Sequence, residues 1–234
     1  MAPLGDRLQR WVVVVVTAST GKRARRSDAG QVPLTTRDAA VLRFLGEQFG
    51  APLSVVAEVY EVGDRAARHN AERLERAGLA TRLTVAGQQW VVPTRAGLRF
   101  ADLDHDVWQP RAWKLEHVEG VARLRLRLQT LYPDATWTSE RAIRSRWANT
   151  GARVRFADGQ LDLPDGRCIG VELELHRKKR HEYEGIGRDV DPAFDAVWWF
   201  CPAADVTWLA DVLEEIPKPD RPAHLVLDVA GVLS

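Results

Sequence analysis

Two alternating segments joined by Pro164-Asp165-Gly166 constrain the fold of this 234-residue chain more than any other feature. Proline presets the first φ of a tight turn, aspartate tolerates the second position and glycine supplies a positive φ. We therefore expect a β-hairpin with one strand over residues 153–163 and the other over residues 167–175. The alternation of apolar and polar residues on both sides of the turn supports this prediction.

The turn also predicts the register of the hairpin: if Leu163 pairs with Arg167, then Asp158 lies opposite Glu172. Successive side chains of a strand point to opposite faces, so this register sorts the residues into two sets. One face collects Leu161, Leu163, Ile169, Val171, Leu173 and Leu175. The other face collects Asp158, Gln160, Asp162, Cys168, Glu172 and Glu174, with His176 at its end. A one-residue slip would mix the two sets, so their separation supports the pairing.

Four carboxylates crowd the polar face of this hairpin, and like charges a few ångström apart disfavour each other's ionised form. A divalent cation removes that penalty. Oxygen ligands from two neighbouring strands suit Mg²⁺ and leave positions open for water and a phosphate. The alternative is a solvated polar face screened by Lys178, Lys179 and Arg180. Composition leaves these two interpretations about even.

The residues around the hairpin predict a mixed sheet flanked by helices, an α/β (α+β) arrangement. Apolar spacing predicts helices over residues 113–131, 177–188 and 204–216, and strands over residues 135–139, 196–201 and 224–229. Nine tryptophans are many for this length. Trp198 and Trp199 are expected in the core or an interface, whereas Trp113, Trp137 and Trp147 are candidates for exposed positions.

The front of the chain has a different order of elements, three short helices followed by a hairpin. The first helix begins at Thr35–Asp38, the second covers residues 53–59, and the third runs from Asp64 to Ala77 with Gly78 as its C-cap. The hairpin covers residues 81–85 and 90–94, with Pro93 predicting an edge strand, and helix resumes over residues 95–101. This order is the plan of a winged helix-turn-helix domain.

The third helix has an apolar face of Ala67, Ala71 and Leu74. Its other faces carry Arg65, Arg68, His69, Arg73 and Arg76. In a winged helix this helix enters the major groove of duplex DNA. Residues near its N-terminus reach base edges most easily, so we expect the first three basic residues to contact bases and the last two to contact phosphates. The alternative is an interaction module whose arginines pair with Glu72 and Glu75.

Charge divides the chain in the same way. The net charge is +1, but basic residues are in excess up to Arg111 and acidic residues are in excess from Ala112 onward. We expect a basic tail over residues 1–33, a winged-helix domain over 34–101, a linker over 102–112 and a second domain over 113–234.

Several classes of protein are excluded by simple criteria. The apolar run Trp11–Val16 is too short for a secretory signal, and no apolar run approaches the roughly 18 residues of a membrane helix. Two cysteines, Cys168 and Cys201, form neither a disulfide scaffold nor a zinc motif. We expect a cytoplasmic protein with no membrane partner.

Asp158, the hairpin turn and Glu172-Leu-Glu174 resemble the PD-(D/E)xK nuclease core, in which acids on neighbouring strands hold the metal. Four phrases together resemble the actinobacterial plasmid replication-relaxation family: Arg155-Phe-Ala-Asp158-Gly, Pro164-Asp-Gly-Arg167, Val171-Glu-Leu-Glu-Leu175 and Val197-Trp-Trp-Phe-Cys201. This resemblance covers residues 35–205. It implies a winged helix, a restriction-endonuclease-like domain, and a role in plasmid or mobile-element replication or transfer.

The chain departs from the nuclease pattern at two positions: Ala157 replaces a proline, and Glu174 stands where lysine is usual. Lys178, four residues after Glu174, can reach back from the start of the following helix. Glu140 is either the upstream acid of the pattern or a helix-start carboxylate.

These observations leave three functions open. The first is a binding protein for double-stranded DNA whose nuclease-like domain is non-catalytic and serves docking or a homodimer. The second is a metal-dependent endonuclease or nickase in which Asp158 and Glu172 hold Mg²⁺, Glu174 or Glu140 assists, and Lys178 offsets phosphate charge. The third is an interaction module without nucleic acid, which would bind DNA neither tightly nor in a salt-dependent way.

Overall fold

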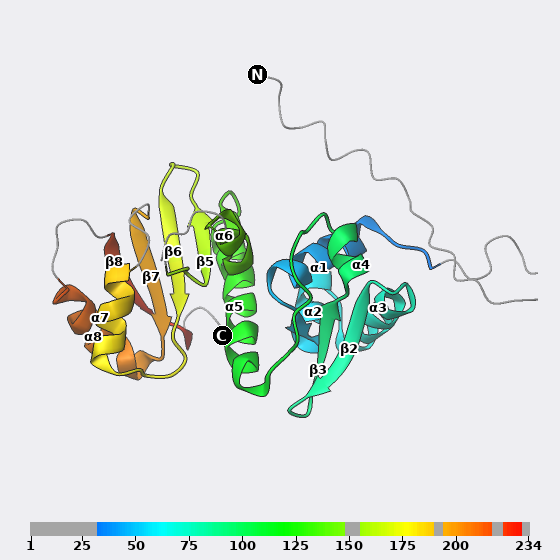
Figure 1. Cartoon of the computed structure of the whole chain (residues 1–234), viewed down its shortest axis with the longest axis horizontal. Coiled ribbons are helices and arrows are strands. Elements are labelled where there is room, and N and C mark those ends of the chain that lie inside the picture. The colour runs from blue at the N-terminus through cyan, green and yellow to red at the C-terminus, as the bar shows by residue number, and fades with distance from the viewer. Residues whose placement is uncertain (1–31, 148–154, 190–193, 217–221, 231–234) are drawn as a thin grey trace, which may run out of the picture. The chain divides into compact units, whose positions relative to one another are not determined.

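The computed structural model describes residues 32–147, 155–189, 194–216 and 222–230. The chain forms two compact units, Met1–Gln109 and Pro110–Ser234 (Figure 1). Most of the expected basic tail, including the run Trp11–Val16, lies outside the described residues, as does the start of the strand expected over 153–163.

The first unit combines four helices with a small sheet in its described part (Figure 1). Its elements are α1 (Thr36–Glu47), β1 (Ala51–Pro52), α2 (Leu53–Tyr60), α3 (Asp64–Arg76), β2 (Ala80–Val85), β3 (Gln88–Pro93) and α4 (Arg95–Phe100). Thr35 begins α1 with a capping box, because its side chain accepts from the Asp38 N–H while the Asp38 carboxylate accepts from the Thr35 N–H. The three helices and the hairpin expected from the sequence are therefore present.

The sheet of the first unit corrects one prediction. Its strand order is β1-β3-β2, so β3 is the central strand and the expectation that Pro93 marks an edge strand is wrong. Proline is tolerated because it is the last residue of β3, where it pairs with Ala80. The two-residue β1 is too short to be recognised from its sequence. Ala86 and Gly87 both have positive φ, which suits the two-residue turn between β2 and β3.

The core of the first unit lies between the three leading helices and this sheet. The predicted apolar face of α3 is confirmed, since Ala67, Ala71 and Leu74 are fully buried. They pack in a core that includes Leu45 and Trp90, also fully buried.

The second unit has five strands in its described part, with helices on both faces (Figure 1). Its elements are α5 (Ala112–Leu131), β4 (Thr136–Ser139), α6 (Glu140–Trp147), β5 (Gly159–Asp162), β6 (Cys168–Leu173), α7 (Arg180–Asp189), β7 (Ala196–Cys201), η2 (Ala203–Asp205), α8 (Val206–Glu214) and β8 (Ala223–Asp228). The strand order is β4-β5-β6-β7-β8. Pairs β4–β5 and β5–β6 are antiparallel, whereas β6–β7 and β7–β8 are parallel. The predicted mixed α/β architecture is confirmed.

The predicted register of the hairpin β5–β6 is also confirmed. Asp162 pairs with Cys168 and Gln160 with Gly170, and the Leu163 N–H donates to the Arg167 carbonyl at 2.9 Å. The strands are shorter than expected, because β5 begins only at Gly159 and β6 ends at Leu173.

The two faces of the hairpin meet different layers of helix. The predicted apolar face packs with Val121, Leu124 and Leu128 of α5. The opposite face of the sheet meets a second cluster that includes Tyr183 of α7 and Leu209 of α8. The α7 helix begins three residues later than expected, which leaves residues 177–179 as a loop.

The tryptophans of the second unit fall in contrasting environments. Trp199 is fully buried, as expected for the apolar strand. The expectation that Trp137 could be exposed is wrong, because Trp137 is buried in the core cluster that includes Leu161. Trp113 is 72% exposed. In the described residues, no helix combines the length and apolar character needed to cross a membrane.

Candidate functional site

The candidate site lies where β6 ends and β5 begins. We use the name carboxylate cluster for Asp158, Glu172 and Glu174. Asp158 directly precedes β5, Glu172 lies within β6, and Glu174 directly follows β6. The charges of Asp158 and Glu174 both act on Glu172, and that of Lys178 opposes them. The structure thus brings together four of the residues singled out in the sequence.

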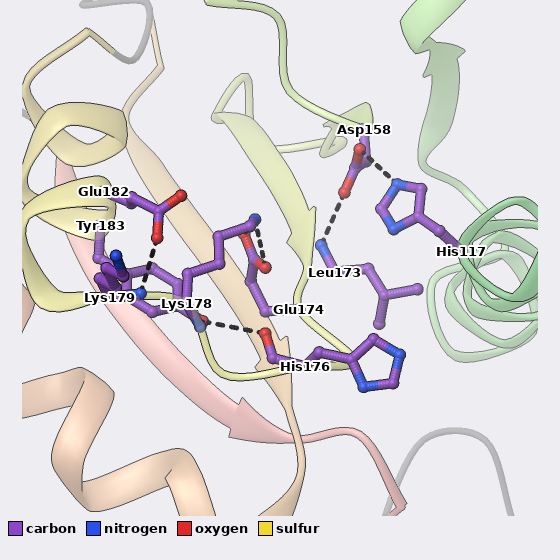
Figure 2. A network of polar contacts seen from close by, with 9 residues as sticks. All are labelled: His117, Asp158, Leu173, Glu174, His176, Lys178, Lys179, Glu182 and Tyr183. Carbon is purple, nitrogen blue, oxygen red and sulfur yellow. Dashed lines mark hydrogen bonds and ion pairs between the residues drawn. The ribbon is translucent and has the colours of Figure 1, made fainter. Parts of the chain in front are cut away.

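Asp158 is held from two sides (Figure 2). Its Oδ2 accepts a hydrogen bond from the backbone N–H of Leu173 at 2.9 Å, and its Oδ1 lies 3.0 Å from Nε2 of His117 on α5. Burial lowers the pKa of His117, but the hydrogen bond to Asp158 and the charges of Asp158, Glu140 and Glu174 outweigh burial and raise it. His117 thus positions Asp158, a role that the sequence analysis did not predict.

Glu172 is the most enclosed member of the cluster. Glu172 as a whole is 2% exposed, and its Oε1 atom is buried without a hydrogen-bond partner among the described residues. Burial raises the pKa of Glu172 well above its usual value, and the Asp158 carboxylate raises it further; Arg155 and Lys178 act in the opposite direction. A buried acceptor without a partner is energetically costly, so this carboxyl favours either a proton or a cation.

Glu174 has a different partner from Glu172. Lys178 reaches back from the loop before α7 and contacts both carboxylate oxygens of Glu174 (Figure 2). Burial raises the pKa of Glu174, and the ion pair with Lys178 offsets part of this effect. The expectation that Lys178 can return to the acids is therefore confirmed, although it does so from a loop rather than from a helix.

Tyr183 fixes the loop that carries Lys178. Its hydroxyl accepts a hydrogen bond from the Lys178 backbone N–H at 3.1 Å and donates to the His176 carbonyl at 3.4 Å (Figure 2). Burial raises the pKa of Tyr183 to about 12, so this hydroxyl keeps its proton at neutral pH. Lys179, which follows Lys178 in this loop, donates its backbone N–H to the Glu182 carboxylate and so caps the first turn of α7.

Two acids considered in the sequence analysis lie outside the cluster. Asp162 accepts a hydrogen bond from the Gln160 side chain at 2.7 Å. The acids that act most strongly on the pKa of Glu172 are Asp158 and Glu174, so Asp162, the fourth carboxylate of the expected face, is not counted in the cluster. Glu140 begins α6 and forms an ion pair with Arg144, consistent with the helix-start alternative. Its charge still acts on His117.

The donor set of the carboxylate cluster can be compared with the needs of Mg²⁺. Within the described part of the chain, no three His, Cys, Asp or Glu side chains are arranged to hold a metal ion by themselves. Mg²⁺, however, is usually held by one or two carboxylates together with waters and substrate phosphates. Asp158 and Glu172 fit that requirement, because the buried Glu172 Oε1 lacks a partner. Glu174 is already neutralised by Lys178.

The basic residues of α3 divide into two groups. Arg65, Arg68, His69 and Arg76 are exposed. The first three have no hydrogen-bond or ion-pair partner among the described residues. The nearby acids of α3 are engaged elsewhere, because Arg82 of β2 pairs with Glu72 at 2.9 Å and with Glu75 at 2.8 Å. The alternative in which the arginines of α3 pair with these two acids is therefore not what the structure contains.

Arg73 belongs to the interior. Its guanidinium lies 2.5 Å from Asp38, which is fully buried and also accepts a hydrogen bond from the Tyr60 hydroxyl at 2.7 Å. A further hydrogen bond, to Asn70, holds the same guanidinium. This ion pair favours a structural role for Arg73 over the expected phosphate contact, since its charge is needed to neutralise a buried carboxylate.

No protein-family model matches the chain, and no curated protein matches it.

Proposed function

We propose that this chain is a DNA-binding protein whose first unit acts as a winged helix on double-stranded DNA. One observation carries the proposal: among the described residues Arg65, Arg68 and His69 of α3 have no ion-pair partner, while Glu72 and Glu75 of the same helix pair with Arg82. A helix with free basic groups at its N-terminal end is suited to the major groove, and the β2–β3 hairpin supplies the wing.

The sequence resemblance extends this proposal to a biological role. It favours a protein of plasmid or mobile-element replication or transfer, similar to the replication-relaxation family. In that setting the second unit is a restriction-endonuclease-like domain. The mixed sheet and the acids at the β5–β6 hairpin support this assignment.

A binding experiment tests the role of α3. Fluorescence anisotropy with labelled duplex DNA would compare the native chain with Arg65→Ala, Arg68→Ala and the double variant over a range of salt concentrations. Each single variant is expected to weaken binding by about 1–3 kcal/mol if the arginine contacts a base. Arg43→Ala is the matched control, since Arg43 is an exposed arginine of α1.

Two outcomes would reject the proposal. One is equal affinity of the double variant and the native chain for duplex DNA. The other is binding that does not weaken as salt rises, because the release of counterions from phosphates makes DNA binding steeply salt-dependent.

The carboxylate cluster favours a second candidate function, a metal-dependent DNA endonuclease or nickase. The observation behind it is the buried, unpartnered Glu172 Oε1 beside Asp158 and the Glu174–Lys178 ion pair. Asp158 and Glu172 would hold Mg²⁺, which when bound activates water and stabilises charge on a phosphate. Lys178 lies where it offsets negative charge, and His117 and the Leu173 N–H fix the direction of Asp158.

Calorimetry with Mn²⁺ and Mg²⁺ tests this candidate, with Glu172→Gln as the key variant. The native chain is expected to bind the cation and Glu172→Gln to lose most of that affinity. Asp162→Asn is the matched control, since Asp162 comes from the same hairpin but lies outside the cluster. Cation binding together with nicking of supercoiled DNA would support the enzyme. Cation binding without cleavage would support the non-catalytic DNA-binding protein.

A further inference from the structure

The inward stripe of α5 continues past the sheet to an exposed aromatic residue. Positions 113, 117, 120 and 124 are spaced by four, three and four residues, so they lie along one side of the helix. Leu124 is fully buried, and Gly120 packs closely against the Leu173 side chain. His117 is next and contacts Asp158. Trp113 therefore stands one helical turn beyond the residue that touches the carboxylate cluster.

Most of the Trp113 side chain is exposed to solvent. It is 72% exposed, and it is the one tryptophan of the described residues that belongs to the exposed class. The Nζ atom of Lys114 lies 5.1 Å from the centre of the ring. Tryptophan is highly buried on average in folded proteins, so this exposed indole leaves a large flat surface one helical turn from His117, the residue that contacts the carboxylate cluster.

We propose that Trp113 is a stacking platform for a nucleobase and that the second unit takes DNA with unpaired nucleotides next to the carboxylate cluster. This inference rests on the proposed function, because it assumes that the chain binds DNA, and it adopts from the second candidate function a DNA phosphate at the carboxylate cluster. A base in an intact duplex has both faces covered by its neighbours in the stack. Only an unpaired or displaced base can lie against the indole.

The surroundings of Trp113 favour a nucleobase over a protein partner. Arg111, Lys114 and Glu116 around it are all exposed, and no second exposed aromatic residue lies in the first turn of α5. The core of a protein interface is depleted of charge, whereas single strands are bound by aromatic rings set among cations. Lys114 supplies a cation at the ring, and Lys178 supplies another at the cluster.

Binding of two labelled DNA hairpins to the full chain tests this proposal. One hairpin is fully paired, and the other has the same paired stem with an unpaired thymidine tail. Three variants are compared with the native chain: Trp113→Ala, Trp113→Leu and Trp113→Tyr. Trp113→Leu keeps an apolar side chain without a ring, whereas Trp113→Tyr keeps a ring. The exposure of Trp113 predicts that all three variants fold, and thermal unfolding checks this.

The native chain is expected to bind the tailed hairpin more tightly than the paired one. Trp113→Ala and Trp113→Leu are expected to lose about tenfold in affinity for the tailed hairpin, which is within the range for one stacked base, and to bind the paired hairpin normally. Trp113→Tyr retains most of the affinity. Equal binding of the tailed hairpin by Trp113→Ala and the native chain would overturn the proposal, as would full affinity in Trp113→Leu.

The same measurements separate this inference from the proposed function. If the native chain binds the paired hairpin but gains nothing from the tail, the stacking platform is wrong and duplex binding by α3 stands. If the native chain binds neither hairpin, the proposed function itself is wrong and the platform falls with it.

Discussion

Asp158 accepts a hydrogen bond at 2.9 Å from the backbone N–H of Leu173, the residue between Glu172 and Glu174. The paired part of β5 begins at Gly159, so the Asp158 side chain takes the place of a strand acceptor at the end of the ladder. The Asp158 carboxylate thus adds a hydrogen bond between the two strands at the end away from the turn, and the same bond holds it close to Glu172 and Glu174. A site made in this way is coupled to the pairing of the strands, and its acids cannot separate unless the hairpin opens.

Glu172→Gln is expected to stabilise the cation-free protein at neutral and alkaline pH. Because folding raises the pKa of Glu172, its protonated form favours the folded state, and this contribution is lost as pH rises through the folded pKa. Glutamine has nearly the same shape and cannot ionise. Thermal unfolding in a chelator should therefore show a higher Tm for the variant at alkaline pH, by about 2–4 °C for each kcal/mol gained.

The difference between Glu172→Gln and the native chain should shrink in acid, where the native Glu172 is also protonated. Added Mn²⁺ should raise the Tm of the native chain and leave that of the variant unchanged. A variant that is less stable than the native chain at every pH would contradict this account of Glu172.

His117 is expected to control cation affinity through the orientation of Asp158. His117→Ala removes the partner of Asp158 Oδ1, and loss of such a supporting contact typically weakens metal binding by about 10–100-fold. His117→Gln keeps a donor and should restore part of the affinity, as measured by Mn²⁺ titration. The matched control is His176→Ala, because His176 is an exposed histidine that pairs with Glu116 outside the cluster. Unchanged affinity in His117→Ala would remove His117 from the site.

Local patterns in the sequence were sufficient for the hairpin and for α3. The Pro164–Gly166 turn and the two-residue alternation determined the β5–β6 register, and the burial of Ala67 and Leu74 followed from helical spacing. The strand register and the buried face of α3 are both determined by residues close together in the sequence. These patterns also placed Lys178 within reach of the acids.

Partners distant in the chain were not predictable from these patterns. His117 is 41 residues from Asp158, and Arg73 is 35 residues from Asp38. Nothing in the local sequence distinguishes Arg73 from the exposed arginines of α3. For His117 one signal was available, since it lies on the same side of α5 as the buried Leu124. The central position of β3 was missed because its second partner, Ala51–Pro52, is only two residues long.

Asp38 and Arg73 are expected to support stability rather than DNA contact. Burial raises the pKa of Asp38, but hydrogen bonds from Tyr60, Arg73 and Thr35 outweigh burial and lower it. The contribution of Asp38 is therefore present above its unfolded pKa and is lost as pH falls through the folded pKa. Arg73→Ala leaves this buried carboxylate without its cation and should lower the free energy of unfolding by about 3–5 kcal/mol, measured by urea titration.

DNA binding separates the two possible roles of Arg73. Below its lowered Tm, Arg73→Ala should bind duplex DNA with nearly native affinity and with the same salt dependence. If Arg73→Ala instead had native stability and its DNA affinity depended less steeply on salt concentration, Arg73 would be a phosphate contact.

Gly159, the first residue of β5, is expected to tolerate no side chain. A Cβ atom there would lie 2.1 Å from a ring carbon of Trp137, which is buried on the neighbouring strand β4. The indole would have to move within a packed core, so Gly159→Ala should destabilise the protein by about 1–3 kcal/mol.

The matched control is Gly185→Ala, because a Cβ at Gly185 of α7 meets nothing within 4 Å. Alanine in a helix interior should stabilise the protein by about 0.5–1 kcal/mol. Since Gly159 directly follows Asp158, the destabilised variant should also bind Mn²⁺ less tightly than Gly185→Ala. Equal unfolding free energies for the two variants would show that Trp137 does not constrain the start of β5.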